Sequence, residues 1–312
     1  VALGTMVEAV FAPVASGGEP SAEARAKLPQ FFDASAPVLP LSEPLQAGAQ
    51  PCFVASGPVP TTAACSAEQQ AQPATFTGAQ AIYSSGFLPD EAKFTVKLDE
   101  GIEPGVYHFM CLVHGADESG TITVVPTGTT IPTPAQVAAE AQAKFDTAVT
   151  ALRPAAEQVQ QSTSPRITVG AEVPGGPGLE FSQDVNVFPK EVTVAAGQAV
   201  TWTVNDAHTV SFNAPEDARP LYVTDADGVV RANRKGADPS NGPGQQPPQA
   251  GAAPTGPTVI DGGRFDGSGF RSSGLLVSLG APVEYTLAFT KAGTYKYRCL
   301  FHLDMEGVVK VS

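Results

Sequence analysis

Short runs of alternating apolar and polar residues, rich in β-branched side chains, occupy most of the second half of the chain. Gly197-Gln198 and similar turn residues separate these runs. Strands of this length, repeated at regular intervals between turns, are typical of an all-β sandwich. The pattern predicts strands at 185–187, 191–194, 199–204, 208–212, 275–279, 283–289, 293–299 and 307–311.

One stretch interrupts this alternation, from about residue 215 to 257. It ends in GADPSNGPGQQPPQAGAAPTGPT, which has few apolar side chains to bury. Segments of this composition do not form a packed core. We therefore expect a Pro/Gly-rich insertion that is a loop or flexible excursion.

A different period appears between the two halves of the chain. Apolar residues recur at helical spacing through 135–152, directly after Pro134, and Pro154 is expected to kink or restart a helix that runs to about 161. Segments rich in Pro, Thr and Ser flank this stretch on both sides. We interpret residues 127–165 as a helical linker between two domains.

An internal repeat defines the domain organisation. The sequence GVYHFMCLVH at 105–114 matches GTYKYRCLFH at 293–302, and Ser84-Ser85-Gly86 matches Ser272-Ser273-Gly274. Both matches have an offset of 188 positions (299 − 111 and 272 − 84). We therefore predict two copies of one β domain, at 1–126 and 166–312, each with a long insertion before its C-terminal hairpin.

Composition and charge narrow the range of functions. The 312 residues are 42% hydrophobic, and 18 basic against 31 acidic residues give a net charge of −13. Nucleic acid is excluded as a partner, because binding phosphates requires clustered Lys and Arg. Apolar runs stay well short of the length of a membrane span. The sequence starts at Val1 without Met or a signal-peptide pattern, so we expect a processed or incomplete chain.

Metal-binding residue types are grouped in the second copy. Cys299, His302 and Met305 lie within seven residues, in a loop short enough to bring the three side chains to one point. A second imidazole, His208, lies far upstream. Two His, one Cys and a Met are the soft ligand set suited to copper in electron transfer, whereas structural zinc sites use more thiolates.

The segment FPKEVTVAAGQAVTW at 188–202, followed by His208-Thr-Val, resembles the first half of a cupredoxin. The strand ending at Cys299 and its C-x2-H-x2-M loop resemble the second half, and the loop is closest to that of amicyanin. The resemblance implies two Greek-key cupredoxin sandwiches and a type 1 copper bound by His208, Cys299, His302 and Met305. The alternative is a buried free thiol at Cys299 and a core histidine at His208.

The ligand pattern is incomplete in the first copy. Cys111 and His114 remain, but no His precedes His108, and Val7 or Met6 stands at the position of His208. The loop after His114 has no Met. We therefore predict a degenerate site without type 1 copper in the first domain.

Two further cysteines, Cys52 and Cys65, lie in the insertion of the first domain. A disulfide between them would stabilise the fold by roughly 3 kcal/mol, and two independent thiols are the alternative. The disulfide requires an oxidising, extracytoplasmic compartment, which also suits a blue-copper protein.

The leading interpretation is a one-electron carrier rather than an enzyme. In copper nitrite reductases and multicopper oxidases, a histidine next to the copper-binding cysteine passes electrons to a second copper centre. Neither Cys111 nor Cys299 has a histidine as its neighbour in the sequence. Net acidity favours basic partners such as a c-type cytochrome or an oxidase domain.

We expect Leu300, Phe301 and Leu303 to form an apolar rim around the edge of His302, and ordinary core packing of these residues is the alternative. The resemblance to cupredoxins implies that such a rim is the docking and electron-exit surface. A structural subunit of a surface assembly is the second interpretation, and copper storage or delivery is the third.

The second interpretation depends on strands that the first copy lacks. Few residues precede Val7, whereas residues 181–205 supply two strands before His208 in the second copy. Missing strands would leave unpaired sheet edges. Either an upstream segment or another polypeptide would then pair with this edge. We predict that another chain completes the edge near residues 1–11, which would allow self-assembly.

Overall fold

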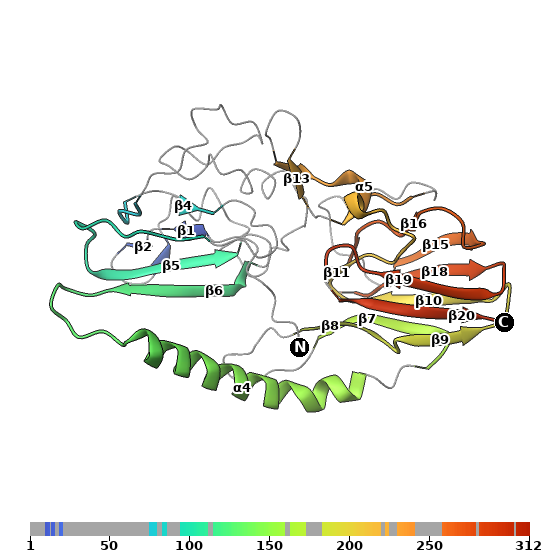
Figure 1. Ribbon diagram of the computed structural model, residues 1–312, viewed down its shortest axis with the longest axis horizontal. Helices are drawn as coiled ribbons and strands as arrows, with labels where there is room; N and C mark the ends of the chain where they lie inside the picture. Colours follow the sequence, from blue (N-terminus) through green and yellow to red (C-terminus); the bar gives the residue numbers. More distant parts are fainter. Residues whose placement is uncertain are drawn as a thin grey trace. The chain divides into compact units, whose positions relative to one another are not determined.

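In the computed structural model of the chain, the described residues are 10–12, 14–15, 19–20, 75–79, 83–85, 94–111, 115–159, 163–172, 183–219, 222–224, 230–240, 258–278, 281–302 and 304–312. The chain divides into two compact units. One contains Thr133–Leu221 and Asn233–Ser312, and the other contains Leu3–Pro132 and Tyr222–Ala232. Strands predominate in both units (Figure 1).

The C-terminal unit is built on two five-stranded sheets (Figure 1). The first has the order β15-β18-β10-β7-β8, and the second has the order β16-β12-β19-β20-β9. A two-stranded pair, β11-β17, lies at the end that carries His208. The strands are β7 (Arg166–Glu172), β8 (Gln183–Phe188), β9 (Glu191–Val194), β10 (Ala199–Val204), β11 (Ala207–His208), β12 (Ser211–Phe212), β15 (Thr258–Phe265), β16 (Arg271–Ser272), β17 (Leu276–Val277), β18 (Val283–Phe289), β19 (Gly293–Arg298) and β20 (Glu306–Val311).

One hydrophobic core fills the space between these sheets. Trp202 on β10 is fully buried and contacts Phe212 on β12 and Tyr297 on β19, with ring centroids 6.0 and 5.4 Å apart. Leu287 on β18 and Val309 on β20 are also fully buried. Because both sheets contribute inward-facing residues to one core, this unit is a β-sandwich.

Several strands match the sequence pattern at both ends. The predicted runs 191–194, 199–204 and 283–289 coincide with β9, β10 and β18. Buried and less buried residues alternate along all of β18, as expected for a strand with one face on the core. The predicted run 208–212 is divided between β11 and β12, since His208 pairs with Leu276 whereas Ser211 pairs with Ser272 and Arg298.

The prediction that residues 215–257 form only a loop is wrong in its first part. This stretch contains the 3-10 helix η3 (Glu216–Ala218), the hairpin β13 (Tyr222–Thr224) and β14 (Val230–Ala232), and the short helix α5 (Arg234–Ala237). Local hydrogen bonds stabilise η3 and α5. Because these bonds leave no periodic pattern of apolar residues, the hydrophobicity of the sequence does not predict the two helices. Residues 241–257 lie outside the described part of the chain.

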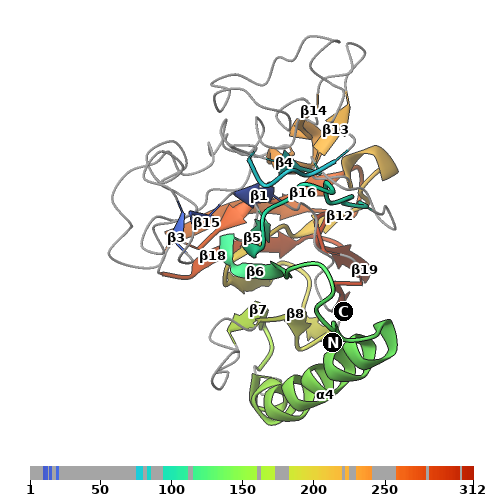
Figure 2. The same ribbon diagram turned by 90° about the vertical axis from the view of Figure 1, so that its left-hand side faces the viewer.

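Helix α4 spans Pro134–Val159, and Figure 2 shows it as one continuous coil. The expected break at Pro154 is therefore absent, and the helix contains this proline. Most of its side chains are exposed, while Phe145, Ala148 and Leu152 are half-buried. Among the described residues, no helix is long and apolar enough to cross a membrane. The role of α4 as a linker stays a prediction.

The N-terminal unit contains a sheet of the order β4-β1-β5-β6. The buried rings of Phe76, Tyr83 and Tyr107 form its small core. A separate pair is formed by β2 and β3. The strands are β1 (Val10–Ala12), β2 (Val14–Ala15), β3 (Glu19–Pro20), β4 (Tyr83–Ser84), β5 (Gly105–Cys111) and β6 (Gly115–Val124).

The sheet order of the N-terminal unit recurs in the C-terminal unit. Val10 pairs with Ser84 and Met110. Ser211 pairs with Ser272 and Arg298. Ser272 comes 188 positions after Ser84, and Arg298 comes 188 positions after Met110. Thus β4-β1-β5-β6 corresponds to β16-β12-β19-β20, and the repeat found in the sequence has the same strand pairing.

The prediction of an open sheet edge near residues 1–11 is wrong for Val10 and Phe11, the two residues of this range that the structure describes. Strand β1 has β4 on one side and β5 on the other, so Val10 and Phe11 do not lie at an edge. Residues 1–9 lie outside the described part of the chain, as do Cys52 and Cys65 of the predicted disulfide.

Candidate metal centre

Two segments that are distant in sequence meet at one end of the C-terminal sandwich. His208 ends β11, which pairs with β17 through His208 and Leu276. Cys299 directly follows β19, and His302 lies in the loop between β19 and β20. The short hairpin thus supplies two of the donors, and β11 brings the third from the first half of the domain.

The three donor atoms form a compact triangle. His208 Nδ1 lies 3.0 Å from His302 Nδ1 and 4.0 Å from Cys299 Sγ, and His302 Nδ1 lies 3.5 Å from that sulfur. Metal–nitrogen and metal–sulfur bonds measure about 2.0 and 2.3 Å. A triangle of this size therefore accommodates a single ion bonded to all three atoms. No carboxylate belongs to this group, so the donors are two imidazoles and one thiol.

The thiol is almost wholly shielded from solvent. Cys299 is 3% exposed, and the amide of Thr209 donates to its Sγ at 3.4 Å. The amide of Leu300 donates to the hydroxyl of Thr209 at 2.8 Å, which fixes this side chain beside the sulfur. Thr209 therefore joins the two halves of the site, since it follows His208 and contacts the residue after Cys299.

The electrostatic surroundings favour a thiolate at Cys299. Burial alone would raise the pKa of this thiol, but hydrogen bonds and charge interactions with His208 and His302 outweigh burial and lower the pKa well below its usual value. The thiolate is the form that binds metal ions. The site is thus chemically suited to a soft cation.

A glycine forms the wall behind His208. Gly170 on β7 has a φ of +65°, and a Cβ at this position would collide with His208 Nε2. Asn205 donates from its side chain to the Gly170 carbonyl at 2.8 Å, and its amide donates to the Val169 carbonyl. The loop before His208 is thereby held against β7, and hydrogen bonds of this kind behind a metal ligand fix its orientation.

Met305 closes the ligand loop from inside the core. The Cys299 amide donates to the Met305 carbonyl at 2.9 Å, and Met305 is fully buried. Asp304 adopts a left-handed conformation with a φ of +62°, which turns the chain before β20. These contacts place the Met305 backbone beside the cysteine, while its role as a fourth ligand stays a prediction.

The structure brings together the predicted residues His208, Cys299 and His302, and it adds supporting residues that the sequence pattern did not predict. The sequence pattern assigned no role to Thr209 or Gly170. Two features of the sequence do indicate them: Thr209 directly follows His208, and Gly170 interrupts the run of strand-forming residues at 166–172. Asn205 holds the loop of His208 through its bond to the Gly170 carbonyl.

The expected apolar rim differs from the structure at Leu300. This residue is buried, with 4% of its surface exposed, whereas Phe301 and His302 are half-buried. Leu303 lies outside the described residues, as does His114 of the first copy. Of the three donors, His302 is therefore the one that reaches the surface.

No protein-family model matches the sequence, and no curated protein matches it. Solved structures do match. A purple cupredoxin from Nitrosopumilus maritimus is 17% identical over 47% of this chain and 98% of its own, with a TM-score of 0.21.

Amicyanin from Paracoccus versutus is also 17% identical, over 49% of this chain and 88% of its own, with a TM-score of 0.22. Auracyanin from Roseiflexus castenholzii is 16% identical over 47% and 94%, with a TM-score of 0.23. These three solved structures are cupredoxins. The His208–Cys299–His302 group offers two imidazole nitrogens and one thiol sulfur, the donor types of a type 1 copper site.

Proposed function

We propose that this protein is a one-electron carrier that binds copper in its C-terminal unit. In this proposal His208, Cys299 and His302 would hold the copper, and Met305 would be a weak fourth ligand. The observation that carries it is the buried triangle of two imidazole nitrogens and one thiol sulfur. Trigonal sites of this donor type are those of copper electron-transfer proteins.

When bound, copper supplies a one-electron Cu(II)/Cu(I) couple. The protein contributes a fixed set of donors, because the hydroxyl of Thr209 and the backbone bond from Cys299 to Met305 hold the loop on both sides. Burial of Cys299 and His208 excludes water from the centre. The half-buried His302 provides the route by which an electron reaches the surface.

The proposal includes one copper per chain and two cupredoxin-like domains, at 1–126 and 166–312, joined by α4. The strand pairing supports it, since Val10 corresponds to Ser211. Counting back three residues from each, Val7 stands where the second copy has His208. Valine has no donor atom, so the first copy lacks one ligand of the set.

We further propose basic redox partners, such as a c-type cytochrome or an oxidase domain, and an extracytoplasmic location. The net charge of −13 supports the first part, because opposite charge accelerates docking. The predicted disulfide between Cys52 and Cys65 would support the location, and mapping of peptides under non-reducing conditions tests it.

Replacement of single cysteines tests the proposed function. Cys299→Ala removes the thiolate, so the copper-loaded variant should lose its intense visible charge-transfer band and most of its copper affinity. Cys111→Ala is the matched control in the first copy and should leave both unchanged. A visible band that persists in Cys299→Ala, or that disappears in Cys111→Ala, would overturn the proposal.

A further inference from the structure

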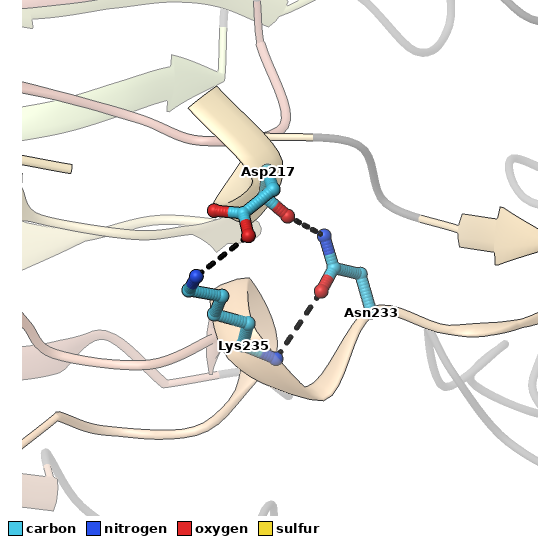
Figure 3. A network of polar contacts seen from close by, with 3 residues as sticks. All are labelled: Asp217, Asn233 and Lys235. Atoms are coloured by element: carbon cyan, nitrogen blue, oxygen red, sulfur yellow. Dashed lines mark hydrogen bonds and ion pairs between the residues drawn. The ribbon is translucent and has the colours of Figure 1, made fainter. Parts of the chain in front are cut away.

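The insertion between β12 and β15 carries a small folded element held by three polar residues. Figure 3 shows them: Asp217 on η3, Asn233 before α5, and Lys235 on α5. Asn233 donates to the Asp217 carbonyl at 2.9 Å and accepts from the Lys235 amide at 3.2 Å. Lys235 Nζ lies 2.7 Å from the Asp217 carboxylate. Asn233 is only 4% exposed, so a buried amide joins η3 to α5.

Helix α5 packs against the residue that follows the thiol. A Cβ at Gly236 would collide with the Ala218 carbonyl of η3 and would lie 3.5 Å from Leu300 Cδ1. Leu300 follows Cys299 directly, and its burial explains why it does not form part of an apolar rim. Helix α5 thus lies against the start of the ligand loop at Leu300, and η3 packs against α5.

A second set of bonds fixes this element to the sandwich. The Leu275 amide donates to the Ala237 carbonyl at 2.8 Å, and the Ser272 amide donates to the Ser240 hydroxyl at 2.6 Å. The neighbouring Ser273 hydroxyl accepts from the amide of Val210 at 2.9 Å. The insertion is therefore attached to the same loop that supports the strand after His208.

We infer that residues 216–218 and 233–240 form a cap that closes the Leu300 side of the metal centre. Solvent and small reagents reach Cys299 when this cap opens, and a protein partner is directed to the side of His302. The statement about a partner rests on the proposed function. The protection of the thiol does not, because it applies equally to the metal-free chain.

Alkylation of Cys299 in the metal-free, full-length protein tests the cap. A small and a bulky maleimide are used at one pH, and mass spectrometry of the peptide that contains Cys299 separates it from the other cysteines. Asn233→Ala removes two hydrogen bonds of the cap, so the rate with both reagents should rise about tenfold, and the preference for the small reagent should decrease.

Lys235→Ala breaks only the exposed ion pair with Asp217 and should give a smaller increase. Lys310→Ala is its matched control, since it breaks a similarly exposed pair with Glu191 on the strand pair β20-β9. Lys310→Ala should leave the rate unchanged.

The cap is refuted if Asn233→Ala alkylates no faster than Lys310→Ala. If Asn233→Ala does not fold, Gly236→Ala replaces it, because the added methyl forces η3 and α5 apart; an unchanged rate in that variant refutes the cap as well. A chain that fails to bind copper but shows the expected alkylation rates would overturn the proposed function and leave the cap standing.

Discussion

At the scale of single residues, the metal centre depends on a glycine that leaves space for one imidazole and on a hydroxyl that fixes the loop beside the thiol. Gly170 makes space for the imidazole of His208, and the hydroxyl of Thr209 bridges to Leu300 beside the thiol. These residues bind no metal themselves. They fix where the donors lie before any ion arrives, which would reduce the reorganisation of the centre in the proposed electron transfer.

Gly170→Ala should displace His208 and destabilise the fold. The added methyl would collide with the imidazole, and the left-handed backbone adds strain, so we expect a loss of about 2–4 kcal/mol in the free energy of unfolding. The visible band of the copper-loaded variant should also shift. Denaturant unfolding and absorption spectroscopy measure the two effects.

Gly197→Ala provides the control for backbone strain. Gly197 also has a positive φ, +89°, but no atom lies within 4 Å of a Cβ placed there. This variant should lose only about 1–2 kcal/mol and should keep the parent spectrum. Equal spectral shifts in the two variants would show that Gly170 does not position His208.

Met305→Leu tests the axial position. Leucine preserves most of the buried volume but removes the thioether, a weak donor that tunes the potential more than the affinity. The variant should retain copper and colour, and its reduction potential should rise because a donor to Cu(II) is lost. Loss of the copper itself, measured by metal analysis, would show that Met305 has a different role.

The residues of the centre divide into two classes of predictability. His208, Cys299 and His302 could be found from the sequence because their chemistry is rare and the hairpin loop is short. Gly170 and Thr209 could not, since their roles depend on which strand lies behind the imidazole and which hydroxyl lies beside the thiol. Pairing between distant strands determines both.

At the scale of elements, the sequence predicts a strand best where buried and exposed residues alternate along its whole length. Strand β18 alternates along its whole length and was predicted to the residue. Strand β7 was missed, although its residues Ile167 and Val169 are buried, because it pairs in parallel with β10 over a short stretch and follows a Pro/Ser-rich segment. The elements η3 and α5 are stabilised by polar contacts that leave no apolar period.

Helix α4 offers a test at this scale. Pro154 lies inside it and cannot donate to the carbonyl of residue 150, a defect that costs about 3 kcal/mol in a helix interior. Pro154→Ala should therefore raise the thermal stability of the helix, measured by far-ultraviolet circular dichroism, and should leave the helical content at low temperature nearly unchanged, because the helix already runs to Val159.

Arg153→Ala changes an adjacent residue of the same helix without altering the backbone bonds, so its helicity should match that of the parent. A clear rise in helical content in Pro154→Ala alone would show that the helix in solution ends before this proline, and an unchanged thermal stability would show that Pro154 does not lie in a helix interior.

At the scale of the whole molecule, an aromatic core joins the two sheets of the C-terminal unit. Trp202 contacts Tyr285 and Tyr297 with ring centroids 5.9 and 5.4 Å apart. Burial raises the pKa of Tyr285 to about 12 and also raises the pKa of Tyr297. The two tyrosines therefore keep their protons in the folded state at pH values where the unfolded chain would lose them.

This difference predicts alkaline destabilisation. An unfolded tyrosine has a pKa of about 10, so stability should be insensitive to these groups below that pH. Above it, the folded state binds more protons than the unfolded state, and stability should fall by about 1.4 kcal/mol per pH unit for each tyrosine. Denaturant unfolding between pH 9 and 12 measures how the free energy of unfolding changes with pH, and this range covers the tyrosine pKa values of the unfolded and folded states. A free energy of unfolding that stays constant over this range would contradict the raised pKa values of the two tyrosines.

Copper stoichiometry, measured together with the visible spectrum, tests the central claim most directly. The purified full-length chain is loaded with Cu(II), freed of excess metal and analysed for copper per polypeptide. We expect one copper per chain, an intense thiolate-to-copper band, and loss of that band on reduction with recovery on reoxidation. Two coppers of equal spectra, or bound copper without the intense band, would contradict this claim.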